Sequence, residues 1–320
     1  MNREKVIVAE PIHEDGIEIL KRKCHVFSLP PGSNEGVLLS QADRTDAVVS
    51  RGFIRITRDF MRAAHKLKVI AVHGAGVDHV DLKAASELDI VVFNTPNALT
   101  DAVAELTVAL ILSLLRRIVA ADRAVRAGQW NRKFSDLIGL ELMGKTVGIV
   151  GLGRIGEAVA RRMSCFNVNI IYSDVLEKRQ LHDELGIKRV AFHELLSTSD
   201  IVTLHTPFTP KTLNMISDAE FSLMKKGIYL VNMARGKVID EKALERALRS
   251  GKVAGAALDV LEEEPPRVDN PLLRFENVIL TPHIGASTRE AMRRMSVQCA
   301  EGVLKVFRGE TPPNVVNVSA

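Results

Sequence analysis

The sequence predicts an α/β fold in which parallel sheets are covered by helices. Short runs of β-branched residues alternate with amphipathic stretches from end to end, which is typical of parallel strands joined by crossover helices. The chain has 320 residues, which is enough for two domains of ordinary size. A glycine-rich turn at one strand-to-helix junction is the third observation that favours this class.

The first hundred residues predict a domain of their own, because they hold five expected strands with helical patterns between several of them. The strands are expected at 6–9, 25–28, 47–50, 69–72 and 90–94, and the helices at 14–22, 57–64 and 81–87.

A turn cluster, Asn94-Thr95-Pro96-Asn97, closes this first part of the chain. From the N-cap Thr100, one long helix is expected to run to about Ala127, before Gly128 stops it. Its most apolar part, Leu106 to Leu115, is short and follows Glu105, so it predicts a buried helix and no membrane span.

The second half predicts another parallel sheet and a closing helix. Its strands are expected at 146–150, 168–173, 201–204, 228–231, 253–258 and 278–280, and the last helix at about 287–308. This helix is expected to pack back on the first domain, which would make that domain discontinuous. We therefore expect residues 1–99 and 288–320 in one domain and 100–287 in the other.

The most informative stretch is Gly151-Leu152-Gly153-Arg154-Ile155-Gly156, which follows an apolar strand and opens a helix. Gly151 permits the tight turn, Gly153 lets the backbone approach a pyrophosphate, and Gly156 allows close packing of helix on strand. The first N–H groups of the helix, at Arg154 and Ile155, would face the phosphates. Asp174, at the end of the next strand and 18 residues after Gly156, would accept hydrogen bonds from a ribose. The stretch predicts a Rossmann-like dinucleotide site, with NAD preferred over NADP.

Composition and charge exclude several other classes. Hydrophobic residues make up 46% of the chain and charged residues 26%, as in a globular protein without long disordered parts. The net charge of +4 comes from basic residues scattered among nearly as many acids, with only 4% aromatic residues. Nucleic-acid binding is therefore not expected.

Cys24, Cys165 and Cys299 are far apart and lack the spacing of metal ligands, so no metal site is expected. We expect buried free thiols in a reducing compartment. The N-terminus runs straight into a strand, which leaves no room for a signal peptide and predicts a cytoplasmic protein.

Three segments at the ends of expected strands offer a cation, a carboxylate and an imidazole. They are residues 231–236 with Arg235, 258–265 with Asp259 and Glu264, and 280–285 with His283 and Gly285. Ligands of open α/β sheets gather at the carboxyl ends of strands. Hydride transfer to a 2-keto acid needs a guanidinium for the carboxylate and carbonyl and a His that delivers a proton. A nearby carboxylate would favour the imidazolium form of that His.

The chain resembles the D-isomer-specific 2-hydroxyacid dehydrogenases over nearly its whole length. The matching motifs are His73-Gly74-Ala75-Gly76-Val77-Asp78, Asn94-Thr95-Pro96-Asn97, Asn232-Met233-Ala234-Arg235-Gly236 and Thr281-Pro282-His283-Ile284-Gly285. In that family the first motif is a substrate loop and the second a hinge. The third and fourth are the arginine and histidine signatures.

The resemblance assigns roles to individual residues. Arg235 would bind the substrate carboxylate and carbonyl, His283 would be the acid/base, and Glu264 its partner. Asp259 would bind the nicotinamide amide. The cofactor would also contact His205, Thr206, Pro207, Met233, Ala234 and Gly285, and the substrate Gly74, Ala75, Gly76 and Val77. The family further implies domain closure and a homodimer formed through the NAD-binding domain.

The substrate is a small 2-hydroxy or 2-keto acid by the same resemblance, with two alternatives open. Arg51 and the segment 128–134, which contains Arg132, resemble phosphoglycerate dehydrogenases and favour 3-phosphoglycerate. The stretch 97–105 resembles glyoxylate reductases more. A third alternative is of another class, since relatives of this fold act as NAD-sensing corepressors that bind partners. Formate dehydrogenase is disfavoured because that family has Gln at the position of Glu264.

Overall fold

The computed structural model describes residues 3–317, which divide into two compact units. One unit contains residues up to Leu99 and from Ala286 on, and the other runs from Thr100 to Gly285. The second of these divisions lies two residues before the expected one. Both units are α/β with parallel sheets, so the predicted fold class is confirmed.

The first unit is built on a five-stranded parallel sheet with the strand order β2-β1-β3-β4-β5. Its central strands are completely buried, as expected for a parallel sheet covered on both faces. The strands are β1 (Lys5–Val8), β2 (His25–Ser28), β3 (Ala47–Ser50), β4 (Val69–Val72) and β5 (Val91–Asn94). The helices are α1 (Glu14–Lys21), α2 (Glu35–Leu39), α3 (Arg58–Ala63), α4 (Leu82–Glu87) and α12 (Arg289–Phe307).

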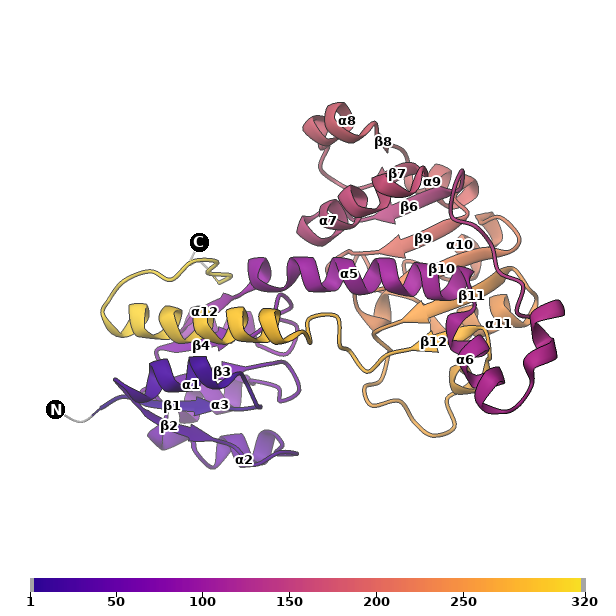
Figure 1. Ribbon diagram of the computed structural model, residues 1–320. Helices are drawn as coiled ribbons and strands as arrows, with labels where there is room; N and C mark the ends of the chain where they lie inside the picture. Colours follow the sequence, from indigo (N-terminus) through magenta and orange to yellow (C-terminus); the bar gives the residue numbers. More distant parts are fainter. Residues whose placement is uncertain (1–2, 318–320) are drawn as a thin grey trace. The chain divides into compact units, whose positions relative to one another are not determined.

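Helix α12 lies beside α1 on this sheet although almost the whole chain separates them (Figure 1). The main-chain N–H of His13, the N-cap of α1, donates a 2.8 Å hydrogen bond to the Ser296 hydroxyl in α12. Cys299 and Val303 of α12 are buried in the core between this helix and the sheet. The C-terminal helix thus completes the first unit.

The second unit has a seven-stranded parallel sheet with the order β12-β11-β10-β9-β6-β7-β8. The strands are β6 (Thr146–Val150), β7 (Asn169–Ser173), β8 (Lys188–Arg189), β9 (Ile201–Leu204), β10 (Ile228–Asn232), β11 (Val253–Leu258) and β12 (Val278–Leu280). The helices are α6 (Ile118–Arg126), α7 (Arg154–Met163), α8 (Arg179–Leu185), α9 (Phe192–Thr198), α10 (Asp218–Leu223) and α11 (Glu241–Arg249). Helix α5 (Pro96–Leu115) contains the division between the units.

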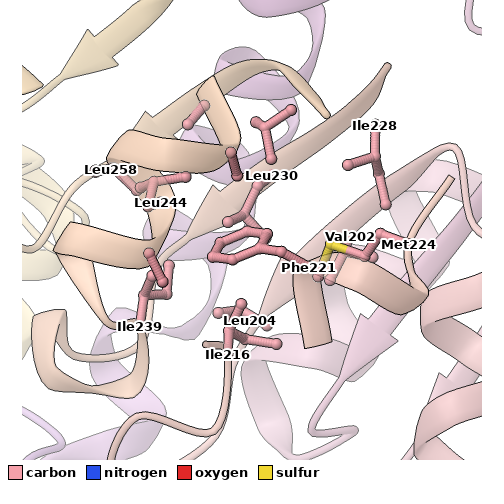
Figure 2. Close-up of a cluster of buried hydrophobic side chains, with 14 of the residues drawn as sticks. Val202, Leu204, Ile216, Phe221, Met224, Ile228, Leu230, Ile239, Leu244 and Leu258 are labelled. Carbon is pink, nitrogen blue, oxygen red and sulfur yellow. The ribbon is translucent and has the colours of Figure 1, made fainter. Parts of the chain in front are cut away.

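Figure 2 shows the main core of this unit, in which Phe221 of α10 lies among side chains of the strands and of α11. Leu204, Leu230 and Leu258 come from three neighbouring strands, and Leu244 comes from α11. This packing fixes the strands whose carboxyl ends carry Arg235, Asp259 and His283.

The expectation of one helix from Thr100 to Ala127 is wrong, because the structure has two helices. Helix α5 ends at Leu115 and α6 begins at Ile118. Arg117 between them has a left-handed backbone with φ 53°, which breaks the helix. Among the described residues, α5 is long and apolar enough to cross a membrane, with a mean hydropathy of 1.9, but 56% of that window is buried inside the protein.

The cysteines differ from the expectation at one position. Cys24 and Cys299 are buried free thiols as expected, but Cys165 is exposed. It lies in a short 3-10 turn after α7, where the chain has already left the core. Burial raises the pKa of the Cys24 thiol to about 11, which keeps this thiol protonated at neutral pH.

Candidate functional site

The glycine turn follows β6 and begins α7. Gly151 has φ 89°, which favours glycine, and a Cβ there would lie 2.9 Å from the main-chain oxygen of His205. A Cβ at Gly156 would overlap the carbonyl group of Gly151. Around Gly153, the N-cap of α7, a Cβ would meet nothing within 4 Å, and no side chain caps the helix there. The first N–H groups of α7 therefore face open space.

Asp174 at the end of β7 is tied to this turn. Its Oδ2 accepts a 2.6 Å hydrogen bond from the Leu152 N–H, and its Oδ1 accepts one of 2.9 Å from the Leu176 N–H. Each oxygen keeps a second lone pair for a ribose hydroxyl. The open helix start and this carboxylate fit a dinucleotide, as the sequence predicts.

His205, after β9, passes close over Gly151. Its Nε2 lies 2.9 Å from the Thr203 hydroxyl, while its Nδ1 is buried without a hydrogen-bond partner in residues 3–317. Burial lowers the pKa of the ring to about 3, so His205 is neutral at physiological pH. Thr206 and the exposed Pro207 continue this segment along the glycine turn, where the sequence predicts cofactor contacts.

Arg235, Asp259 and His283 follow β10, β11 and β12, which are neighbours in the sheet. The carboxyl ends of parallel strands meet at the same edge, so the structure brings the three segments together. Met233 and Ala234 are buried beside them, and Met233 lies against Gly285.

His283 and Glu264 form a hydrogen-bonded pair. The His283 Nδ1 lies 2.8 Å from the Glu264 Oε2, and the Leu261 N–H donates to the other carboxylate oxygen at 3.1 Å. With Nδ1–H donating to Glu264, His283 keeps Nε2 for exchanging a proton with a substrate. Burial alone would raise the pKa of Glu264, but its hydrogen bond to His283 and the charges of His283 and Arg235 hold that pKa below its usual value. Glu264 is therefore a stable anion beside the imidazole.

Asp259 fixes the loop that carries His283. Its buried carboxylate accepts a 2.6 Å hydrogen bond from the Thr281 hydroxyl and two of 2.8 Å from the N–H groups of Ile284 and Gly285. The His283 N–H donates to the Asp259 carbonyl oxygen at 2.8 Å. Since a carboxylate has about four lone-pair sites, these contacts leave Asp259 one site for the expected bond to a nicotinamide amide.

The turn after β10 holds the main chain of Arg235 in place. The buried Asn232 side chain accepts from the Ala234 N–H at 3.0 Å and donates to the Arg235 carbonyl oxygen at 2.9 Å. The Arg235 Nη1 donates to the Ala234 carbonyl oxygen at 2.7 Å. A Cβ at Gly236 would overlap the main chain of Leu261 and Glu262, so the arginine loop and the loop of Glu264 touch at this glycine.

The loop Gly74–Val77 lies after β4 in the first unit. Asn94 donates to the Ala75 carbonyl oxygen at 2.6 Å, and the Thr95 hydroxyl accepts from the Gly74 N–H at 3.0 Å. The N–H groups of Ala75, Gly76 and Val77 donate no hydrogen bond to any residue from 3 to 317. These three donors suit an anion such as a carboxylate.

The loop of Arg51, after β3, is held by the buried carboxylate of Glu10, which follows β1. Glu10 accepts hydrogen bonds from the main-chain N–H groups of Arg51, Phe53 and Ile54 at 2.8–3.0 Å. The Arg51 Nη1 donates to the Pro11 carbonyl oxygen at 2.9 Å. Burial lowers the pKa of Arg51 and the charge of Glu10 partly offsets this, but the guanidinium stays charged at neutral pH.

Arg132 lies in a 3-10 turn of the second unit and binds carboxylates of its own chain. Its guanidinium pairs with Asp136 and with Glu276, the latter at 3.1 Å, and donates to Gln129. A substrate phosphate would have to compete with these two carboxylates for Arg132. Of the predicted site residues, Arg132 is therefore the one whose predicted role its local contacts favour least.

Sequence reasoning assigned no role to several residues that hold the site together. Four of them lie inside the motifs named above: Asn232, Thr281, Asn94 and Thr95. Their polar side chains at the ends of expected strands could have indicated that they fix the loops of the site. Glu10 also follows a strand, but nothing in the sequence indicates that its carboxylate binds three main-chain N–H groups of another loop.

The comparisons with known proteins show the family of the chain. Residues 108–285 match the family model described as the D-isomer specific 2-hydroxyacid dehydrogenase, NAD binding domain. The chain is 45% identical over 315 residues to a D-3-phosphoglycerate dehydrogenase of Methanocaldococcus jannaschii. The alignment covers 98% of this chain and 59% of that protein. It thus spans little more than half the length of that relative.

Other relatives match along 95% of their length or more. A glyoxylate reductase of Thermofilum pendens is 44% identical, with 99% of this chain and 95% of that protein covered. The crystal structure of a D-lactate dehydrogenase of Aquifex aeolicus with NAD and lactic acid superposes with a TM-score of 0.89 at 29% identity, covering 99% of this chain and 100% of that chain. The chain thus shares its fold with this D-lactate dehydrogenase and is similar in sequence to relatives of different names.

Proposed function

Because the chain belongs to the D-isomer specific 2-hydroxyacid dehydrogenase family, we propose that it is an NAD-dependent enzyme that interconverts a D-2-hydroxy acid and its 2-keto acid. The observation that carries this proposal is the 2.8 Å contact between His283 and Glu264, on the sheet edge that also carries Arg235. Together they supply a proton donor, its counter-charge and a fixed cation.

In the reductive direction, each of these residues has a defined task. The Arg235 guanidinium binds the substrate carboxylate and polarises the carbonyl group. Protonated His283 gives its Nε2 proton to the carbonyl oxygen, and Glu264 stabilises the imidazolium. When bound, NADH supplies the hydride to C2. In the oxidative direction His283 takes up the hydroxyl proton instead.

We expect Thr281→Val to lower kcat by about tenfold, because the loss of one hydrogen bond to a charged group is worth roughly 1.5–3 kcal/mol. The variant removes the hydroxyl that donates to Asp259 and loosens the loop of His283. Thr281→Ser keeps the hydroxyl and serves as the matched control. Steady-state kinetics with a saturating keto acid decide the matter, and equal rates for Val and Ser would contradict the role of this hydrogen bond.

For the substrate we propose the pair 3-phosphoglycerate and 3-phosphohydroxypyruvate. Arg51 supports it as a charged guanidinium after β3, near the open N–H groups of the Gly74–Val77 loop in the same unit. The relatives named D-3-phosphoglycerate dehydrogenase give further support. Glyoxylate or hydroxypyruvate is the second candidate. The relatives named glyoxylate reductase match over 95–97% of their length, and Arg132 is already paired with carboxylates.

The substrate proposal predicts a kcat/KM for 3-phosphoglycerate about tenfold to a hundredfold above that for glycerate, the value of one charge-assisted bond to phosphate. Arg51→Met should erode this preference and leave glyoxylate reduction nearly intact. Arg55→Met, an exposed arginine of the same loop, is the control. If Arg132 also binds the phosphate, Arg132→Ala should erode the preference for the phosphorylated substrate as Arg51→Met does. An equal loss of kcat/KM on the phosphorylated and the unphosphorylated substrate would mean that Arg132 has a structural role. A protein that reduces glyoxylate well and ignores phosphohydroxypyruvate would favour the second candidate.

We also propose a homodimer formed through the NAD-binding unit. Large apolar side chains that are more than half exposed gather in one segment of this unit, which favours a protein contact. They are Ile118, Val125, Trp130, Phe134, Ile138 and Met143.

Light scattering should therefore give about twice the chain mass of 35.2 kDa. Replacing Phe134 and Ile138 together by Asp should halve that mass, because two carboxylates would be desolvated in the contact. Val175→Asp, at an apolar side chain that is 91% exposed elsewhere in the unit, is the control. A monomeric native protein would contradict the proposal.

A further inference from the structure

The loop after β7 carries the carboxylate that is expected to bind the ribose of NAD, and apolar packing does not hold this loop. Asp174 is its first residue. The next two side chains, Val175 and Leu176, are 91% and 65% exposed. Because neither of them is buried in a core, the position of the Asp174 carboxylate depends on hydrogen bonds.

Four of these bonds have their donors or acceptors in the loop and in the glycine turn, and they fix only one side of it. Asp174 Oδ1 accepts from the Leu176 N–H at 2.9 Å, and the Lys178 N–H donates to the hydroxyl of Tyr172 in β7 at 2.9 Å. Asp174 Oδ2 accepts from the Leu152 N–H of the glycine turn at 2.6 Å, and the Gly151 N–H donates to the last carbonyl group of β7 at 2.9 Å. These contacts tie the loop to its own strand and to the turn that follows β6.

Arg189 of β8 holds the loop from the other side. β8 is the edge strand beside β7, and Arg189 stands opposite Tyr172 in the parallel register (Figure 1). The Arg189 Nε and Nη2 donate to the Asp174 carbonyl oxygen at 3.1 and 2.7 Å, and Nη2 also donates to the Val175 carbonyl oxygen at 3.2 Å. The planar fork of the guanidinium thus spans two successive carbonyl groups, and one of them belongs to Asp174 itself.

These main-chain contacts are what distinguishes Arg189 from the other arginine near this loop. Arg179 pairs with the Glu177 carboxylate at 3.0 Å, and exposed ion pairs of this kind contribute little. Arg189 is also exposed, but in residues 3–317 it pairs with no carboxylate and donates only to the chain segment that carries Asp174.

We propose that Arg189 is a positioning residue for cofactor binding, which fixes the main chain at Asp174 and thereby directs the carboxylate toward the adenosine ribose of NAD. This inference rests on the proposed NAD-dependent function. Its physical basis is preorganisation, because a ribose that meets a fixed carboxylate does not have to order the loop first. β8 and β12, the strand before His283, are at opposite edges of the sheet, so Arg189 should act on cofactor binding and not on proton transfer.

The test is a titration of the complete protein with NADH, followed by fluorescence. In Arg189→Met we expect the Kd for NADH to rise by about threefold to tenfold, the range of one net hydrogen bond. The KM for NADH should rise as well, whereas kcat with a keto acid should stay nearly native, because the ground state and the transition state lose the same binding. The melting temperature should be nearly native, since the residue is exposed.

Lys188→Met is the matched control. It removes the same charge from the neighbouring exposed position of β8, and the Lys188 side chain makes no hydrogen bond with any residue from 3 to 317. The Kd for NADH of this variant should be native. Equal losses of affinity in Lys188→Met and Arg189→Met would mean that positive charge alone attracts the cofactor, which would overturn the inference.

A double variant shows whether Arg189 acts through Asp174. Asp174→Ala should raise the Kd for NADH at least about tenfold. Adding Arg189→Met to it should change the Kd by less than about twofold, because the carboxylate that Arg189 positions is already gone. Losses that multiply in the double variant, or a native Kd in Arg189→Met alone, would overturn the inference and leave the proposed function standing. A native Kd in Asp174→Ala would contradict the proposed NAD site itself, and the inference with it.

Discussion

Replacing His283 by Ala is expected to lower kcat by at least about a hundredfold, the usual size of a general acid/base contribution. The Nε2 of His283 is the nitrogen left free by the hydrogen bond to Glu264, so the variant removes the proton donor itself. NADH should still bind with nearly unchanged affinity, because the glycine turn and Asp174 follow other strands of the sheet. The measurements are kcat with a saturating keto acid and the Kd for NADH by fluorescence.

The control for this prediction is His193→Ala, at an exposed ring in α9. It should retain native turnover. Near-native turnover of the His283 variant would mean that another group delivers the proton, and a loss of NADH affinity as large as the loss of kcat would mean that His283 acts on cofactor binding.

Replacing Gly236 by Ala is expected to damage stability and activity together. The added methyl group would overlap the main chain of Leu261 and Glu262, which cannot rotate away as a side chain could. Overpacking of this kind costs about 1–3 kcal/mol, and relief of the clash must separate the arginine loop from the loop that carries Glu264. We therefore expect a lower melting temperature and a kcat/KM reduced by about tenfold to a hundredfold, in proportion to that cost.

Gly36→Ala is the matched control for this variant, because Gly36 is exposed in the short helix α2 and a methyl group there would meet only the Asn34 side chain, with its Oδ1 at 3.3 Å, and no main chain. Its melting temperature should not fall, since alanine is the better helix former. A Gly236→Ala protein with native stability and native kinetics would show that the two loops are not in contact as described.

The parts of the fold that follow from local pattern could be predicted from the sequence. Buried runs such as Val69–Val72 and Val278–Leu280 are strands because β-branched and apolar residues stand together between turn residues. The glycine turn could be predicted because each of its glycines stands where a side chain would be strained or would clash. The structure has a left-handed backbone at Gly151 and a close main-chain contact at Gly156. The pairing of His283 with Glu264 came from the resemblance, since 19 residues separate them.

What could not be predicted depends on contacts between distant segments. The break between α5 and α6 lies at Arg117, a residue type that gives no sign of a left-handed backbone. The three hydrogen bonds on Asp259 join residues 22 to 26 positions apart, and the ion pair of Arg132 with Glu276 joins residues 144 positions apart. Their partners are common surface residue types, so composition and spacing indicate nothing about them.

The most direct test of the central claim is the oxidation of NADH by the purified chain with glyoxylate, hydroxypyruvate and 3-phosphohydroxypyruvate, followed by absorbance. If Arg235 binds the keto acid and His283, paired with Glu264, delivers the proton as proposed, at least one of these acids should be reduced with turnover that His283→Ala lowers at least about a hundredfold. Hydroxypyruvate and 3-phosphohydroxypyruvate should then give the D-isomers of their products, whereas glyoxylate gives glycolate, which is not chiral. Tight NADH binding without turnover of any of the three would contradict the claim and favour an NAD-sensing protein that acts by binding partners.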